Sequence, residues 1–199
     1  MKHEVIKDQT LVVIKPDAVK RALVGKIIAK FENVGLKLIA LKMIKPDSEQ
    51  VMGNYPTKDK KWITGLGEKS LNTFQQLNLD PLEYLSTNDP YQIGLQVLSK
   101  LVDHWTSGPI VAMVWQGPHA VEIIRKLRGV TTPLQAEPGS LLGDYSFDSQ
   151  LISNIQQRAM RTFVHATGSK EEADREIAHW FKPEELLPNY SRTDHTAML

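Results

Sequence analysis

One histidine stands at a position suited to covalent chemistry. His165 lies in a short apolar run, RTFVHA (161–166), and the small residues that follow leave space around its ring. A nucleophilic histidine needs one neutral ring nitrogen free to attack, and an acceptor that holds the other nitrogen. Glu171 is six residues further on, close enough to fold back as that acceptor, although a helix dipole also favours an acid there. A lone histidine in a strand can equally be structural.

Groups that could hold phosphate oxygens lie in three other places. Lys15 ends an apolar run, and Thr131 lies in a later loop. Arg125 and Arg128 are three residues apart on one helical face. Phosphate transfer needs cations and hydroxyls aimed at the moving oxygens, and an arginine fork suits them better than a lysine. Taken singly, each of these residues is also compatible with a solvated surface position.

The hydrophobic pattern predicts alternating strands and helices. Strands are expected at 10–15, 36–44, 109–115 and 161–166, and the main helices at 23–31, 89–105, 117–128 and 169–180. Ser169 begins a capping box, so its hydroxyl has a structural role available as well as a place near the histidine. With small helices set aside, the order is β-α-β-β-α-β. This order predicts a ferredoxin-like α/β (α+β) fold, with a four-stranded antiparallel sheet and helices on one face.

Two segments stand apart from this pattern. Residues 56–91 are polar and dotted with Gly and Pro. We expect them to form short helices and turns, as an insertion within a single domain (1–199) and without a core of their own. Residues 130–144 form a loop rich in Thr, Pro and Gly, and loops of that length inside a compact domain are usually functional.

Composition excludes several classes of protein. The chain has 199 residues, 41% of them hydrophobic and 24% charged, with a net charge of +1 and no cysteine. Disulfides and thiolate metal sites are therefore excluded, and no overall basic charge favours nucleic acid or anionic membranes. The apolar runs are too short to span a bilayer, and the polar N-terminus is unlike a signal peptide. We expect a cytoplasmic protein with no membrane partner.

Several stretches together resemble the nucleoside diphosphate kinase family. TLVVIKPDAVKRALVGKIIAKFENVGLKLIALKMIKP (10–46), SGPIVAMVWQG (107–117) and PGSLLGDYS (138–146) are similar to that family in sequence and order. So are the R-x-x-x-G-x-T-x-P pattern of 125–133 and the segment FVHATGSKEEADREIAHWF (163–181). The resemblance covers most of the chain outside 56–91. It implies transfer of a terminal phosphate between nucleotides by a ping-pong mechanism, and a homo-oligomer.

The resemblance also implies a role for each matched residue. His165 is then the phosphorylated nucleophile, Glu171 holds its far nitrogen, and Ser169 and Tyr55 lie beside it. Lys15 contacts the sugar and the terminal phosphate region, Arg125 and Thr131 bind phosphates, and Trp62 stands where the family has a phenylalanine that stacks on the base. Mg²⁺ is expected to arrive with the nucleotide, held by phosphates and water, with no metal site built by the protein.

Departures from the family pattern keep two alternatives open. Leu142 stands where the family has a phosphate-binding arginine. One phosphate contact is therefore missing, unless Arg128 or Arg161 supplies it. Thr162 replaces an asparagine before the histidine, which alters a hydrogen bond to the sugar. The first alternative is therefore a catalytically weak nucleotide-binding scaffold or regulator. The second is a nucleic-acid-binding ferredoxin-like module, although only Trp115 and Phe163 are aromatic on the predicted strands and nucleic acid is an improbable partner at this charge.

Overall fold

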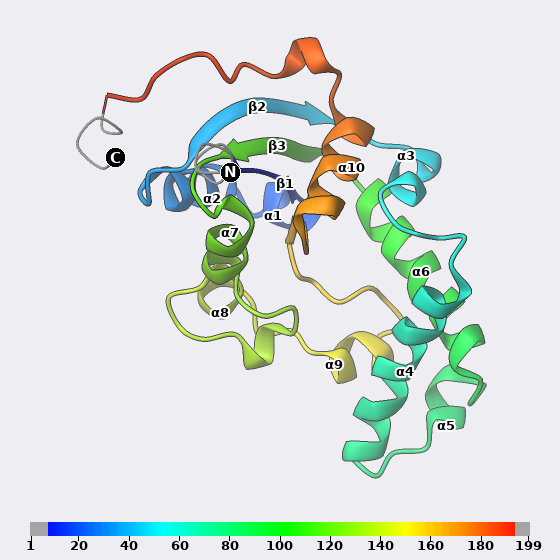
Figure 1. Cartoon of the computed structure of the whole chain (residues 1–199). Helices are drawn as coiled ribbons and strands as arrows, with labels where there is room; N and C mark the ends of the chain where they lie inside the picture. Colours follow the sequence, from blue (N-terminus) through cyan, green and yellow to red (C-terminus); the bar gives the residue numbers. More distant parts are fainter. Residues whose placement is uncertain (1–7, 194–199) are drawn as a thin grey trace.

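The predicted antiparallel sheet is present. The computed structural model describes residues 8–193, and its strands are β1 (Gln9–Ile14), β2 (Lys37–Ile44), β3 (Ile110–Gln116) and β4 (Val164–Ala166). They lie in the order β2-β3-β1-β4, and Figure 1 labels the first three of these strands. Val13 in the central strand β1 faces Ala112 of β3 on one side and His165 of β4 on the other. The ferredoxin-like α/β fold is confirmed, and it places the histidine beside a strand that is buried from Thr10 to Ile14.

Helices cover both faces of this sheet. They are α1 (Pro16–Lys20), α2 (Val24–Glu32), α3 (Ser48–Gly53), α4 (Lys60–Gln76), α5 (Pro81–Leu85), α6 (Pro90–Thr106), α7 (Ala120–Arg128), α8 (Leu141–Tyr145), α9 (Gln150–Ile155) and α10 (Lys170–Trp180), with short 3₁₀ helices η2 (Pro133–Gln135) and η3 (Pro183–Glu185). In the part of the chain that the structure describes, none of them has the length and apolar character of a membrane span.

The expectation of helices on one face alone is wrong. Strand β3 is buried at every residue, so its side chains need a partner on each side of the sheet. One core cluster joins the sheet to α1, α2 and α7 through residues such as Phe31 and Ile124. A second cluster joins the opposite face to α3, α6 and α10 through Val51, Trp105 and Ile177.

The insertion is more regular than its sequence indicates. Helix α4 is continuous over 17 residues, where short helices and turns were expected. Phe74, Leu85 and Ile93 also form a small buried cluster that is separate from the two clusters on the sheet. Figure 1 shows α4, α5 and the start of α6 extending to one side, below the sheet in this view. The insertion therefore has a minor core of its own, attached through α6 to the main one.

Two glycines allow α4 and α6 to touch through their backbones. A Cβ atom added at Gly67 would lie 1.9 Å from the carbonyl oxygen of Pro90, and one at Gly94 would lie 2.0 Å from that of Ile63. No side chain fits at either contact, so glycine is required by the close approach of the two helices. The contact fixes the position of α4 relative to α6, which carries buried Trp105 into the core beside the sheet.

Candidate active site

His165 is held through one of its two ring nitrogens. The Nε2 atom lies 2.8 Å from Oε2 of Glu176, whose side chain is only 4% exposed. The hydroxyl of Thr167 donates to the same oxygen at 3.0 Å. Among residues 8–193, no hydrogen-bond partner is found for Nδ1. An acceptor on Nε2 places the proton of a neutral imidazole there, and leaves Nδ1 with the free lone pair.

The prediction that Glu171 holds the histidine is wrong. Glu171 is exposed in the first turn of α10, whereas Glu176 lies on the buried face of that helix, which packs against the sheet. Ser169 caps the helix, since its Oγ accepts from the backbone N–H of Glu172 at 3.2 Å. Thr167, which the sequence analysis did not single out, contacts the same carboxylate oxygen of Glu176 as His165 does. A helical projection of α10 could have found Glu176, because the buried face includes positions 173, 176, 177 and 180.

Two aromatic rings contact the histidine, and a third stacks on one of them. The ring centroid of Tyr55 lies 5.9 Å from that of His165, and that of Trp105 lies 5.6 Å from it, both in edge-to-face arrangements. Trp62 stacks on Tyr55, with ring centroids 5.6 Å apart. Burial and the nearby carboxylate of Glu176 raise the pKa of Tyr55, so its hydroxyl stays protonated and can donate. Tyr55 therefore lies beside His165 as expected, and Trp105 is a neighbour that the sequence pattern did not indicate.

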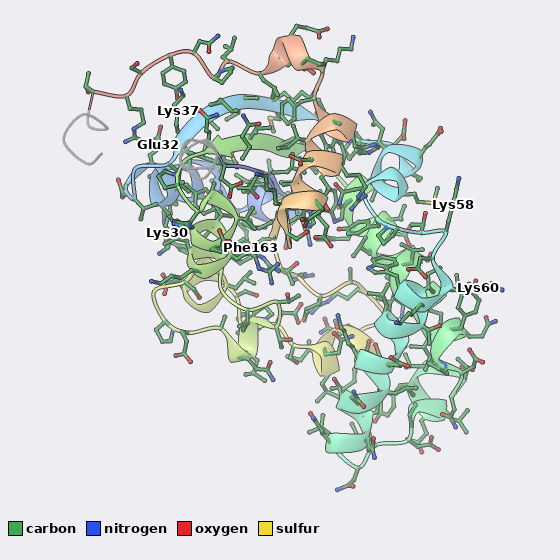
Figure 2. All side chains as sticks on the ribbon, viewed as in Figure 1. Lys30, Glu32, Lys37, Lys58, Lys60 and Phe163 are labelled. Carbon is green, nitrogen blue, oxygen red and sulfur yellow. The ribbon has the colours of Figure 1, made fainter. Side chains whose placement is uncertain are left out.

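Lys15 is buried at the end of β1. Its ammonium donates to Oγ1 of Thr162 at 2.7 Å, and its backbone N–H donates to the carbonyl of Phe163 at 2.8 Å. Burial is the main cause that lowers the pKa of Lys15 to about 8, and the charge of Arg128 adds to it. Phe163, labelled in Figure 2, has a φ of +29°, a strained backbone conformation for a bulky residue. The strain lies in the turn that presents Thr162 to Lys15.

Arg128 is a second buried cation at this site. Its Nε donates to the carbonyl oxygen of Val164 at 3.0 Å, and its Nη2 lies 3.4 Å from Oγ1 of Thr131. Burial and the neighbouring charge of Arg125 lower the pKa of Arg128. Leu142, at the position where the resemblance implies an arginine, is fully buried in the core.

A cavity of about 310 Å³ joins these groups. Its lining includes most of the residues expected from the sequence, together with Arg128: Lys15, Tyr55, Arg125, Arg128, Thr131, Thr162 and His165. Trp62, Ser169 and Glu171 are not part of the lining. Arg161 lines a separate cavity of about 840 Å³. Lys58, before α4, and Lys60, its first residue, are exposed and point outward (Figure 2).

The charges of the cavity suit an anion. Six of its lining residues are lysines or arginines, and Glu172 is the one carboxylate among them. Within residues 8–193, no group of three histidines or acids could hold a metal ion. The lining therefore offers cations and hydroxyls to phosphate oxygens, with a histidine nitrogen free to attack among them.

Comparisons with known proteins agree with this chemistry. The family model described as nucleoside diphosphate kinase matches residues 8–66 and 91–186, and leaves out 67–90, within the insertion. The nucleoside diphosphate kinase of Pyrobaculum aerophilum is 46% identical over 180 residues, covering 90% of this chain and 98% of that protein. The enzyme of Pyrococcus furiosus is 37% identical, covering 90% of this chain and 86% of that protein.

Solved structures give the same result. A crystal structure of an NDP kinase from Pyrobaculum aerophilum matches with a TM-score of 0.87 and 44% identity, over 91% of this chain and 99% of that one. A transition-state mimic of the nucleoside-diphosphate kinase from Borrelia burgdorferi, with bound vanadate and ADP, matches with a TM-score of 0.75 and 30% identity, over 96% of each chain. The chain belongs to the nucleoside diphosphate kinase family.

Proposed function

We propose that His165 carries the phosphoryl group between two nucleotides and that its Nδ1 atom is the nucleophile. The chain transfers the terminal phosphate of a nucleoside triphosphate to a nucleoside diphosphate, the reaction for which its relatives are named. The observation that carries the proposal is the 2.8 Å contact between Nε2 and Glu176, which leaves Nδ1 free. Both the cations and the histidine line one cavity.

The transfer proceeds in two balanced steps. The lone pair of Nδ1 attacks the terminal phosphorus of the donor, the bond from that phosphorus to the bridging oxygen breaks, and the nucleoside diphosphate leaves. The imidazole is then cationic, and the carboxylate of Glu176 stabilises it through Nε2–H. A terminal phosphate oxygen of the acceptor then attacks the phosphorus and the P–N bond breaks, which restores the neutral ring. Dividing the reaction in this way lets one site serve both nucleotides.

Buried cations would stabilise the charge that moves onto the phosphate oxygens. Lys15 and Arg128 are fixed by hydrogen bonds to Thr162 and to the backbone of Val164, so little reorganisation is needed when a phosphate arrives. Arg128 takes the role of the arginine that Leu142 replaces. Arg125 and Thr131, on the same side of the cavity, complete the phosphate contacts.

The other predicted residues take supporting roles. Thr162, bonded to Lys15, lies where the nucleotide sugar is expected, and the protonated hydroxyl of Tyr55 can donate to a phosphate oxygen. Trp62 supports the ring of Tyr55 instead of stacking on a base. Ser169 acts by starting helix α10, which carries Glu176.

The cavity fits a magnesium ion that comes with the nucleotide. Because Glu172 is its only lining carboxylate, phosphate oxygens and water would supply most of the ligands, with Glu172 available to bind one of those waters. Bound in this way, Mg²⁺ would neutralise charge on the phosphates. Lys15 and Arg128 would orient the same phosphates from the protein side.

The two alternatives find less support. A weak scaffold was suggested by Leu142, but Arg128 supplies a buried guanidinium at the cavity. A nucleic-acid-binding sheet needs exposed aromatic residues, whereas Trp115 and Phe163 are both fully buried. A homo-oligomeric assembly and a cytoplasmic location stay predictions, to be measured by sedimentation and by cell fractionation.

Phosphoenzyme formation tests the proposal. The protein is mixed with ATP labelled at the terminal phosphate, and then with an unlabelled diphosphate. We expect an acid-labile, base-stable label that the diphosphate removes, and no label in His165→Ala. His179→Ala is the matched control, because His179 is exposed on α10 and outside the cavity. Labelling that persists in His165→Ala would show that another residue accepts the phosphate.

A further inference from the structure

Trp105, near the end of α6, is a buried residue that lies against two groups of the active site at once. Its side chain is fully buried. The ammonium nitrogen Nζ of Lys15 lies over the indole ring, 5.6 Å from its centroid. The ring centroid of His165 is also 5.6 Å from that of Trp105, with an angle of 63° between the two planes. One side chain therefore contacts both the proposed nucleophile and a cation proposed to bind phosphate.

Two further rings fix the orientation of this indole. Trp180 of α10 stacks with Trp105, with ring centroids 6.1 Å apart and an angle of 20° between the planes. Tyr55 meets Trp105 edge to face, at a centroid distance of 6.0 Å. Trp180 is itself held, because its Nε1–H donates to Oδ1 of Asn54 at 2.6 Å. These contacts leave the ring of Trp105 little freedom to turn within the closely packed core.

The contact between the ammonium and the indole favours the charged form of Lys15. Burial acts in the opposite direction, and it lowers the pKa of Lys15 to about 8. Among aromatic side chains the indole attracts a cation most strongly, and exclusion of water strengthens the attraction. Trp105 therefore offsets part of the cost of burying the lysine. A phosphate-binding lysine must be charged, so this offset bears directly on the reaction.

Other titratable groups also act on Lys15. Asp17 of α1 favours the ammonium through its negative charge, and Arg128 of α7 disfavours it. Asp17 is paired with His104 of α6, with Nε2 and Oδ1 3.2 Å apart. His104 and His165, on α6 and β4, line the same cavity as the lysine. All four groups are kept when the indole alone is replaced, so a change in the titration of Lys15 would report the loss of the ring.

We propose that Trp105 is a positioning residue for phosphoryl transfer, which holds the ammonium of Lys15 charged and in a fixed place beside His165. Trp105 is not part of the cavity lining, so it acts through these two neighbours and does not touch the nucleotide. The inference rests on the proposed function. It adds to that function a residue of α6 that fixes the lysine and the histidine relative to each other.

The titration of Lys15 tests the contact without any phosphate transfer. The lysines are labelled with ¹³C at Cε, and the NMR signal of Lys15 is identified by its absence from Lys15→Arg. Trp105→Leu removes the ring face and should lower the pKa of Lys15 by about one unit, the size expected of a buried contact of this kind. Trp105→Phe keeps a weaker ring face, and should lower the pKa by about half as much.

Trp115→Leu is the matched control. Trp115 is also fully buried, and its Nε1 atom, like that of Trp105, has no hydrogen-bond partner among the described residues. It packs in the other core cluster, against Phe31 at a centroid distance of 5.4 Å. The same substitution there also removes packing, but should leave the pKa of Lys15 unchanged. Melting temperatures show whether each variant is folded, and Trp105→Phe with Trp115→Phe gives the comparison if the leucine variants are not.

Phosphoenzyme formation measures the consequence for the reaction. The second-order rate constant for labelling by ATP is followed by rapid quench from pH 6 to pH 9. In Trp105→Leu the decline at high pH should begin about one pH unit lower than in the wild type. At pH 6, where Lys15 is charged in every variant, labelling should be on the order of tenfold slower, because the lysine and the histidine are less well aligned. In the Lys15→Arg background, Trp105→Leu should cause no shift with pH.

The outcomes distinguish this inference from the proposed function. A pKa of Lys15 that is equal in the wild type and both Trp105 variants would overturn the inference, as would an equal shift in Trp115→Leu. A shifted pKa with labelling unchanged at every pH would overturn the role of Trp105 in the reaction. A wild-type protein that never takes up label would overturn the proposed function, while the titration of Lys15 would still decide whether the contact exists.

Discussion

The two sides of the cavity differ in the residues that line them. On the sheet side, Lys15, Arg128 and His165 each have a hydrogen-bond partner that fixes them before any ligand arrives. On the side formed by α4, α6 and α9, the apolar residues Leu66, Val97 and Leu101 line the cavity together with polar residues such as Lys69 and Ser153. Phosphoryl transfer needs charged groups that are oriented in advance. The difference places the groups suited to that chemistry on the sheet side.

The largest expected effect is at Arg128. Arg128→Ala removes a buried guanidinium from the sheet side, and should lower kcat/KM about 10²- to 10³-fold, as the loss of a donor aimed at the transition state does. Arg161→Ala, which changes the neighbouring cavity, should alter kcat/KM by no more than about twofold. Steady-state kinetics of both variants, with melting temperatures as a check on folding, compare the two arginines. Equal losses of kcat/KM in Arg128→Ala and Arg161→Ala would refute the role given to Arg128.

The next effect is at the residue that orients His165. Glu176→Gln keeps the size of the side chain but removes the charge that stabilises the imidazolium, and should slow phosphoenzyme formation about 10- to 100-fold. Glu171→Gln, in the exposed first turn of α10, should leave the rate nearly unchanged. Rapid-quench measurement of labelling provides the comparison. A larger loss of labelling rate in Glu171→Gln than in Glu176→Gln would favour Glu171, the residue expected from the sequence, as the partner of His165.

The pH dependence of kcat/KM, which reflects the free enzyme, should report the ionisation of the buried Lys15. Burial holds the pKa of Lys15 at about 8, below its ordinary value of 10.5, so its charge is present below pH 8 and is lost above it. We expect kcat/KM to fall as the pH rises through about 8, and Lys15→Arg to remove this decline because arginine stays charged. Burying the charged lysine destabilises the fold below pH 8, and because the unfolded chain keeps the proton to higher pH, this penalty is relieved and the free energy of unfolding rises between pH 8 and 10.5 while activity falls. An unchanged profile in Lys15→Arg would contradict the assignment.

Substitutions where α4 meets α6 should change the stability of the fold and have the smallest effect on turnover. Gly94→Ala places a Cβ against the backbone of Ile63 and should lower the free energy of unfolding by about 1–3 kcal/mol. Gly65→Ala, on the facing helix α4, meets nothing within 4 Å and should raise the free energy of unfolding by about 0.5–1 kcal/mol. Denaturant titration measures both changes. The reverse order would show that the two helices do not meet as described.

The sequence predicted the sheet better than the insertion of residues 56–91, for physical reasons. Continuous apolar runs and a recognisable histidine segment indicated the strands and His165. The choice between Glu171 and Glu176 depended on which face of α10 packs on the sheet, and that face is set by tertiary contacts. Nor could a polar, glycine-bearing segment indicate α4, since its helix depends on the backbone contact of Gly67 and Gly94 with their neighbours. The role of Arg128 was open until its burial was known.

The isomer of phosphohistidine tests the central claim most directly. Labelled with ¹⁵N in its histidine rings and phosphorylated by ATP, the denatured protein can be examined by NMR at high pH for coupling between phosphorus and one ring nitrogen. The account predicts phosphorus on Nδ1 of His165, because Nε2 is held by Glu176. Phosphorus on Nε2, or on a different histidine, would contradict it.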